Sequence, residues 1–393
     1  MALNLEKLSK FDLEEDLENR LFEDRKPTRL FEFINTIHKI QTVEQFIRDC
    51  PTYPKSTDSI IEDELRSAVG ATLAIEGTML KDEEIEESFH KANLKKKLEK
   101  KQQEAQNTRK AYRYIIKVVD EGGDRFTYSE AHIKKIHQYL TEGIQYVSPN
   151  VPGQYRDLKA RFGEPQKYSF CKNKVDIEAI MPKFITWLNE SGSGPLTGSD
   201  VVKAIMAHYY LTEIHPFGDG NGRTARTLEA LVLCATNKRA YSYRSMAKFW
   251  NNNRNEYILY LGNVRDTCNP WEFLIWGAKG YLIEVQRIKD LVLKKVKQLM
   301  LKDYASWLFR NKKIRPRIFG ALMLLISSGK MPFDKFISSP ELTILYAQRT
   351  LSTRYRDFKK MEKTLGLIRI FKEDGKKFIE PNFQKLETLK YEV

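Results

Sequence analysis

The 393-residue sequence is poor in cysteine and has no long hydrophobic run. Its four cysteines, Cys50, Cys171, Cys234 and Cys268, lie far apart and form no C-x-x-C pair, which indicates reduced thiols. No apolar run approaches the roughly 18 residues of a membrane-spanning helix. The amino-terminal residues contain no basic region followed by an apolar segment. We therefore expect no signal peptide, no membrane partner and a cytoplasmic location.

The sequence also lacks the histidine spacing of a zinc enzyme. Its six histidines form no H-E-x-x-H motif, and we expect His137 and His208 to pack between helices rather than to bind metal. Hydrophobic residues make up 41% of the chain and charged residues 30%, which is typical of a soluble globular protein. The length predicts two or three domains.

Positive charge is concentrated in the last part of the chain. The net charge is +14, and residues 281–393 contain 25 Lys and Arg against 12 Asp and Glu, a net of +13. This asymmetry favours an acidic partner, such as nucleic acid, for the carboxyl-terminal segment alone.

The polar chemistry of the sequence is concentrated in residues 215–226, HPFGDGNGRTAR. This stretch combines an imidazole, a carboxylate, a carboxamide, two guanidinium groups and three glycines. Apolar residues recur at helical spacing before it, at positions 202, 205, 206 and 209, and after it, at positions 228, 231, 232 and 235. The pattern predicts a helix, a loop and a second helix that begins near Asn221.

The three glycines, Gly218, Gly220 and Gly222, permit positive φ angles and let successive N–H groups converge on an anion. The start of the second helix adds positive potential at the same place. The stretch lacks the Gly-Lys-Ser/Thr of a Walker A loop and the spacing of a dinucleotide fingerprint. A calcium loop starting at Asp219 would place Arg223 where an oxygen ligand is needed. We therefore predict a phosphate-binding loop.

The stretch matches the pattern H-P-F-x-D/E-G-N-G-R-x-x-R at every defined position, and on these residues the chain resembles the Fic family. The resemblance implies an all-α Fic-fold core and transfer of AMP from ATP to a protein hydroxyl. It implies that His215 is the general base and that Asp219 holds Mg²⁺ against the α- and β-phosphates. Asn221 and the glycine N–H groups would bind phosphates, Arg223 the β-phosphate and Arg226 the γ-phosphate.

A second motif upstream resembles the inhibitory helix of the same family. Residues 72–77, Thr-Leu-Ala-Ile-Glu-Gly, match S/T-x-x-x-E-G/N and end a helix predicted over residues 59–75. The resemblance implies that Glu76 pairs with Arg226 and occupies the place of the γ-phosphate, so that ATP binds without its productive geometry. The alternative is a surface glutamate beside a helix end.

Two further motifs extend the resemblance. Residues 152–156 match P-G-x-F/Y-R, and the strand-like residues 158–174 correspond to a hairpin, the flap, that in the family aligns a target segment by backbone pairing. The proline cluster usual after the flap is missing. Residues 253–257 match N-R-x-x-Y, which places Tyr257 either beside the adenine or in the core. The flap aromatics that could contact a target are Phe162, Tyr168 and Phe170.

The remaining patterns are mostly helical. We expect a solvated helix face over residues 81–110 that continues into 111–116, and helices over 129–140, 175–188, 271–283 and 289–309. Helices over 317–326 and 348–365, followed by a hairpin around Asp374-Gly375, resemble a winged helix. Winged helices bind DNA or proteins. The basic residues that could meet a DNA groove are Arg349, Arg354, Arg356, Lys359 and Lys360.

These patterns predict three regions: an N-terminal helical region (1–100) with an inhibitory helix at about 59–77, a Fic catalytic core (101–285) and a winged-helix-like domain (286–393). The leading hypothesis is a self-inhibited protein adenylyltransferase, a nucleotidyltransferase that uses ATP and Mg²⁺ to modify a Ser, Thr or Tyr hydroxyl of a target or of itself. The alternatives are a DNA-binding regulator whose Fic core senses nucleotide, and a Fic enzyme that uses another nucleotide or removes AMP. The target, the relieving signal and the oligomeric state, a homodimer included, stay open.

Overall fold

The computed structural model describes residues 27–50, 54–91, 99–162, 167–168, 171–190, 200–236, 245–267 and 269–388. The chain divides into two compact units, Met1–Lys289 and Asp290–Val393, which are described separately below. The larger unit contains both the predicted N-terminal helical region and the predicted Fic core. Within the described ranges, no helix has the length and apolar character that a bilayer crossing requires.

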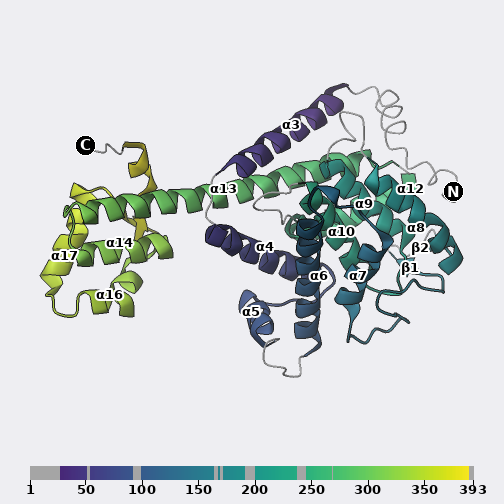
Figure 1. The fold of residues 1–393 in the computed structure, drawn as a ribbon, viewed down its shortest axis with the longest axis horizontal. Helices are drawn as coiled ribbons and strands as arrows, with labels where there is room; N and C mark the ends of the chain where they lie inside the picture. The colour runs from purple at the N-terminus through teal and green to yellow at the C-terminus, as the bar shows by residue number, and fades with distance from the viewer. Residues whose placement is uncertain are drawn as a thin grey trace. The chain divides into compact units, whose positions relative to one another are not determined.

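The larger unit is helical, as the sequence predicts (Figure 1). Its helices are α3 (Pro27–Asp49), α4 (Pro54–Ile75), α5 (Asp82–Lys91), α6 (Lys100–Gly122), α7 (Glu130–Thr141), α8 (Lys174–Asn189), α9 (Asp200–Ile214), α10 (Asn221–Thr236), α11 (Ala247–Asn252), α12 (Arg254–Thr267) and the first part of α13 (Trp271–Arg310).

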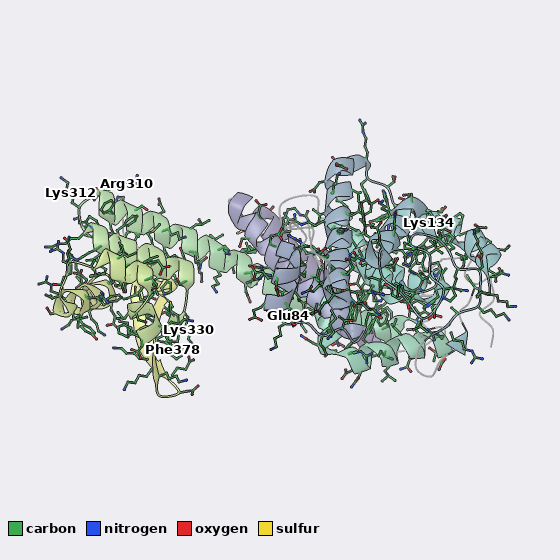
Figure 2. All side chains as sticks on the ribbon, turned by 90° about the horizontal axis from the view of Figure 1, so that it is seen from below. Glu84, Lys134, Arg310, Lys312, Lys330 and Phe378 are labelled. Atoms are coloured by element: carbon green, nitrogen blue, oxygen red, sulfur yellow. The ribbon has the colours of Figure 1, made fainter. Side chains whose placement is uncertain are left out.

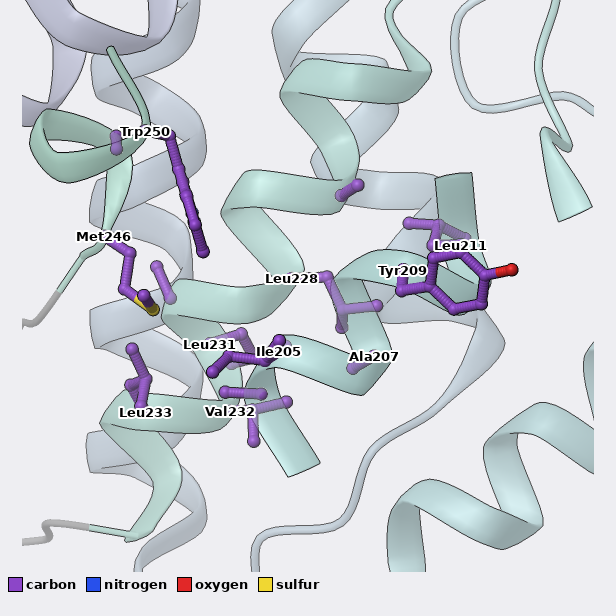
Figure 3. Close-up of a cluster of buried hydrophobic side chains, with 14 of the residues drawn as sticks. Ile205, Ala207, Tyr209, Leu211, Leu228, Leu231, Val232, Leu233, Met246 and Trp250 are labelled. Carbon is purple, nitrogen blue, oxygen red and sulfur yellow. The ribbon is translucent and has the colours of Figure 1, made fainter. Parts of the chain in front are cut away.

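Helices α9 and α10 form the centre of this unit, and α4, α6 and α7 also pack against α10. Ile205 on α9 and Leu228, Leu231 and Val232 on α10 are fully buried, and Figure 3 shows them in one cluster with Trp250. Burial of each such side chain contributes roughly 1.5 to 3 kcal/mol. The loop between α9 and α10 is therefore attached at both ends to the buried core of the unit.

Two helix predictions are wrong in their boundaries. The charged segment 81–110 is not one helix face: α5 ends at Lys91, and α6 starts afresh after Glu99, whose capping box with Gln102 supplies a new start. The segments 271–283 and 289–309 form a single helix, α13, of 40 residues. No proline or glycine interrupts residues 281–309, and the buried Val285 and Ile288 continue the apolar stripe between the two predicted helices.

The predicted flap hairpin is present. Strand β1 (Arg161–Phe162) pairs antiparallel with β2 (Lys167–Tyr168). The side chains of Phe162, Tyr168 and Phe170 lie outside the described part of the chain, so their predicted target contacts stay predictions.

The smaller unit combines helices with one small antiparallel sheet. Its elements after α13 are α14 (Pro316–Ser328), β3 (Met331–Pro332), α15 (Phe333–Ile337), α16 (Pro340–Leu345), α17 (Leu351–Lys359), η3 (Lys360–Thr364), β4 (Ile368–Glu373), β5 (Lys376–Pro381) and η4 (Phe383–Thr388). The strand order is β3-β5-β4. The predicted hairpin is confirmed, since Asp374 (φ 49°) and Gly375 (φ 75°) form a two-residue turn with both φ angles positive.

Several details of this unit differ from the predicted pattern, since the short helices α15 and α16 are not among the predicted elements. Helix α17 begins at Leu351 instead of 348 because the Thr350 side chain caps it by accepting a hydrogen bond from the Thr353 N–H. Strand β3 was not predicted, since two residues are too few to show a period.

Candidate active site

The backbone of the 215–226 loop needs its glycines for different reasons. Gly220 has a positive φ of 75°. Gly218 and Gly222 have no positive φ but lie against other groups: a Cβ on Gly218 would stand 2.0 Å from the Pro149 carbonyl oxygen, and one on Gly222 would stand 2.7 Å from Glu76 Oε1. Close approach to the Pro149 backbone, rather than left-handed backbone, therefore accounts for Gly218, whereas the carboxylate beside Gly222 is the end of a flexible side chain.

Asn221, the first residue of α10, fixes the shape of this loop. Its Oδ1 accepts a hydrogen bond from the Phe217 N–H at 2.9 Å, and its Nδ2 donates to the Phe217 carbonyl at 2.8 Å. The Asn221 side chain is 3% exposed, and this residue closes the loop on itself before any ligand is considered. The predicted phosphate contact of Asn221 is therefore left to its backbone N–H.

His215 directly follows α9 and has a strained φ of 49°. Its Nδ1 lies 3.3 Å from the Thr212 carbonyl oxygen, which can only accept, so we assign the ring proton to Nδ1 and a lone pair to Nε2. Burial, aided by the positive charge of Arg156 and Arg265, lowers the pKa of His215 to about 3. The imidazole is therefore neutral at neutral pH, the form a general base requires.

Arg156, the last residue of the P-G-x-F/Y-R motif, connects the loop with the flap. Its Nε donates to the His215 carbonyl at 2.7 Å, its Nη1 to the Leu158 carbonyl and its Nη2 to the Cys171 carbonyl at 2.6 Å. Its backbone N–H donates to the Pro216 carbonyl at 3.0 Å. The buried Arg156 guanidinium therefore fixes the His215 backbone relative to both ends of the flap.

His137, predicted to pack between helices, is also hydrogen-bonded on both ring nitrogens. Its Nδ1 accepts from the Gly153 N–H at 2.9 Å, so its Nε2 carries the proton and donates to the Asp219 carbonyl at 2.9 Å. The ring stacks on Phe217 at 3.7 Å between centroids. Burial lowers the pKa of His137 to about 4. A neutral His137 therefore supports the loop through its contacts with Asp219 and Phe217, and we assign it no part in the reaction.

Asp219 and Arg223 meet at the open side of the loop. Asp219 Oδ1 accepts from the Gly220 N–H at 2.5 Å and from Arg223 Nη2 at 3.3 Å, and the side chain is 39% exposed. Arg223 Nη2 also donates to the Tyr146 hydroxyl at 3.1 Å. No sequence pattern pointed to Tyr146, because it lies in an irregular segment about 70 residues before the loop.

The donor set suits a magnesium ion that is bound mainly by phosphates. Among the described residues no group of three His, Cys, Asp or Glu side chains could hold a metal by themselves. Asp219 supplies a single, partly exposed carboxylate, and Mg²⁺ typically uses one or two carboxylates together with substrate phosphates and water. The Nε atoms of Arg223 and Arg226 are buried and find no partner among the described residues, as expected of arginines that await an anion.

Glu76 and Arg226 lie together, as the inhibitory motif predicts. Arg226 Nη2 donates to Glu76 Oε1 at 2.6 Å and to the Thr72 carbonyl at 3.3 Å. Arg226 is 1% exposed, whereas the Glu76 side chain is 40% exposed. Burial opposes ionisation of Glu76, but the charges of Arg226 and Arg223 outweigh it and lower the pKa of Glu76. The pair is therefore ionised at neutral pH.

The end of α4 is shaped to present Glu76 at this position. Gly77 adopts a φ of 88°, and the Thr78 N–H returns to the Leu73 carbonyl at 2.9 Å, which stops the helix. Arg254, from the N-R-x-x-Y motif, donates from Nε to the Ile75 carbonyl at 3.0 Å. Arg226, through the Thr72 carbonyl, and Arg254 therefore both satisfy carbonyl groups at the negative end of the α4 dipole.

Tyr257 lies in the core rather than at an open nucleotide surface. It is 4% exposed, and its hydroxyl lies 2.8 Å from His208 Nε2. Of the two placements that the sequence left open for Tyr257, the core is the observed one.

The fold and the loop define a class of protein: an all-α protein whose polar site lies in the loop between two central helices. Residues 127–233 match the Fic/DOC family model. The chain therefore carries a Fic domain.

The relatives agree with this domain assignment. Protein adenylyltransferase Fic of Drosophila melanogaster is 49% identical over 101 residues, and that of Drosophila willistoni is 49% identical over 104 residues. These matches cover 26% of this chain and 19% and 20% of the fly proteins, so the matched part is about a fifth of each relative.

Solved structures agree in fold. A Fic family protein from Desulfovibrio desulfuricans G20 superposes with a TM-score of 0.54 at 16% identity, covering 90% of this chain and 96% of that one. Fic-1 of C. elegans (residues 134–508) gives 0.54 at 20% identity, covering 71% and 78%.

Proposed function

We propose that the protein is a self-inhibited protein adenylyltransferase that transfers AMP from ATP to a Ser, Thr or Tyr hydroxyl. The observation that carries the proposal is His215, whose Nδ1 faces the Thr212 carbonyl oxygen at 3.3 Å, beside a glycine loop that also holds the two buried arginines Arg223 and Arg226. The adenylyltransferase names of the fly relatives support the same reaction, although the match covers only a fifth of those proteins.

In the proposed reaction the target hydroxyl oxygen attacks the α-phosphorus of ATP. The bond between the α-phosphorus and the bridging oxygen breaks, pyrophosphate leaves with the bond electrons, and the hydroxyl proton passes to His215 Nε2. Mg²⁺ at Asp219 would neutralise phosphate charge. Arg223 and Arg226 would hold the β- and γ-phosphates, and the N–H groups at the start of α10 would stabilise the charge that develops in the transition state.

The inhibition that we propose acts through Arg226. The 2.6 Å bond to Glu76 occupies a nitrogen that the γ-phosphate would otherwise meet, and a carboxylate at this position also repels phosphate oxygens. ATP would then bind with its α-phosphate out of line with the incoming hydroxyl. Release of Glu76 would leave the charge of Arg226 uncompensated and its Nη2 available to the γ-phosphate.

The test is transfer of label from α-labelled and γ-labelled ATP with Mg²⁺ and cell lysate as the source of target. Three full-length proteins are compared: wild type, Glu76→Gly, and Glu76→Gly with His215→Ala. We expect α-label on protein that rises in Glu76→Gly and disappears in the double variant. Label from the γ-position alone would mean phosphorylation. Absence of both labels would reject adenylylation in favour of another nucleotide or of AMP removal.

A second candidate function rests on a surface of the smaller unit. We propose that α17 binds the groove of duplex DNA as the helix that precedes the hairpin of a winged-helix-like fold. The exposed face of α17 carries Ser352, Tyr355, Arg356 and Lys359 at helical spacing. The one acidic residue of the helix, Asp357, is buried and paired with Arg317 at 2.5 Å. This face therefore offers cations and hydrogen-bond donors without a competing carboxylate.

The other basic residues named on this segment differ in accessibility. Arg349 is exposed. Arg354 packs over Tyr346 and donates to the Ile337 carbonyl at 3.1 Å, and Lys360 donates to the Lys313 carbonyl at 3.4 Å. We therefore place the DNA contact on Arg356 and Lys359 and assign Arg354 and Lys360 to the fold.

Fluorescence anisotropy with a labelled duplex at several salt concentrations tests this second candidate. Arg356→Glu with Lys359→Glu should abolish the salt-dependent binding. Lys294→Glu with Lys297→Glu on α13, which changes the net charge equally, should weaken binding only slightly. Equal loss in both double variants would indicate nonspecific charge attraction, and no binding by the wild type would reject the DNA-binding function.

A further inference from the structure

The backbone of Asp219 is held from both sides by side chains of other segments. Its N–H donates to Asn150 Oδ1 at 3.0 Å, and its carbonyl oxygen accepts from His137 Nε2 at 2.9 Å. Neither partner belongs to the loop or to α10, since His137 lies on α7 and Asn150 lies in the irregular segment that follows α7. The position of Asp219 is therefore set from outside the loop that contains it.

The segment around Asn150 lies directly against the loop. A Cβ on Gly218 would stand 2.0 Å from the Pro149 carbonyl oxygen and 3.1 Å from the Asn150 Cα. The Asp219 N–H can only donate, so the Asn150 atom that faces it is the oxygen of the side-chain amide. Asn150 therefore acts on the loop as an acceptor whose own backbone is packed in place.

The Asp219 carboxylate keeps one oxygen available to a cation. Its Oδ1 accepts from the Gly220 N–H at 2.5 Å and from Arg223 Nη2 at 3.3 Å, whereas its Oδ2 makes no hydrogen bond to any residue that the structure describes. A carboxylate oxygen must approach Mg²⁺ to about 2 Å in a nearly octahedral arrangement, which tolerates little displacement of the backbone that carries it. The contact at the Asp219 N–H therefore bears on metal binding.

We infer that Asn150 is a positioning residue that fixes the Asp219 backbone so that its carboxylate can hold Mg²⁺ against the phosphates of ATP. The inference rests on the proposed function. Asn150 acts only through the Asp219 N–H and contacts neither the metal nor the nucleotide. Without this acceptor the carboxylate would occupy several positions, and the metal would have to select one of them at a cost in affinity.

The experiment measures ATP affinity by isothermal titration calorimetry in full-length Glu76→Gly protein, once with Mg²⁺ and once with EDTA in its place. The ratio of the two affinities reports the contribution of the metal. Adding Asn150→Ala, or Asn150→Leu, which keeps the size of the side chain, should lower this ratio about fivefold, since one neutral hydrogen bond is lost. The affinity in EDTA should stay within about twofold, which also shows that the variant is folded. Asn150→Asp keeps the acceptor oxygen and should leave the ratio at or above that of Glu76→Gly.

The control is Asn189→Ala, which removes another asparagine acceptor, bonded to the Tyr128 N–H at 2.8 Å, and should change neither affinity. Equal weakening with Mg²⁺ and with EDTA in Asn150→Ala would assign Asn150 to the general shape of the nucleotide site and overturn the inference. An unchanged ratio would overturn it as well. A loss in Asn150→Asp equal to that in Asn150→Ala would do the same, because it would assign the effect to the donor Nδ2.

These titrations separate the inference from the proposed function. If Glu76→Gly protein transfers no α-label, the proposed function fails, and the ratio of the two affinities still decides the role of Asn150. If Glu76→Gly protein binds ATP equally well with Mg²⁺ and with EDTA, the inference fails whatever the label transfer shows.

Discussion

Replacing Glu76 by Gln should make the protein less stable and its ATP binding tighter. The change keeps the size of the side chain but removes the charge that lies 2.6 Å from Arg226 Nη2. A hydrogen bond between charged groups contributes roughly 1.5 to 3 kcal/mol, and the lower end applies because Glu76 is 40% exposed to solvent. We therefore expect a loss of about 1.5 kcal/mol in the free energy of unfolding. If ATP must displace the same contact, its affinity should rise by about tenfold.

Urea unfolding and nucleotide titration of the same Glu76→Gln protein measure the two effects. The matched control is Glu130→Gln, which breaks an ion pair of similar length, 2.7 Å to Lys134 (labelled in Figure 2), whose side chain is 38% exposed, whereas that of Arg226 is 1% exposed. That change should cost less than about 0.5 kcal/mol and leave ATP affinity unaltered. A Glu76→Gln protein that loses stability without gaining ATP affinity would refute the idea that Glu76 and the γ-phosphate compete for Arg226.

Three further predictions follow from the loop. Gly218→Ala should lower the free energy of unfolding, measured in urea, by about 3 kcal/mol, because its Cβ would stand 2.0 Å from the Pro149 carbonyl oxygen. The control is Gly262→Ala in α12, whose Cβ would meet no other atom and which should raise the free energy of unfolding by about 0.5 kcal/mol. Lowering the pH from 7 to 5 should reduce the free energy of unfolding by about 2 kcal/mol through His137, whose pKa is near 6.5 in the unfolded chain and about 4 in the folded protein. His137→Gln should therefore lose less stability than the wild type between pH 7 and pH 5. Arg156→Lys keeps the charge but loses the several donors of the guanidinium, so we expect faster amide hydrogen exchange in β1 and β2. Unchanged exchange would contradict the idea that Arg156 holds the flap.

The sequence was sufficient to place the loop because its information is local. Asn221 begins α10 as predicted, and Glu76 meets Arg226 as its motif implied, since both patterns carry turn or cap residues at fixed spacing. Partners from distant segments were not accessible in this way. Tyr146 reaches Arg223 across 77 positions of the sequence, and no periodicity connects the two.

The misplaced boundaries have a related cause. Residues 284–288 of α13 looked like a junction because the composition turns basic after them, but the buried Val285 and Ile288 continue the apolar stripe there.

Tyr257 was ambiguous for another reason. An aromatic ring with a hydroxyl suits a nucleotide base and a helical core equally well, and only its burial and its hydrogen bond to His208 decide between them.

The contacts of Arg156 also bear on how such a protein can diversify. Among the described residues, its guanidinium holds the flap through the Leu158 and Cys171 carbonyl oxygens, groups that every amino acid possesses. Substitutions at these two positions can therefore keep both acceptors, and with them the hold of the same guanidinium on the histidine backbone. A lineage could exchange one recognition segment for another, and so acquire new targets, while its reaction centre stayed the same.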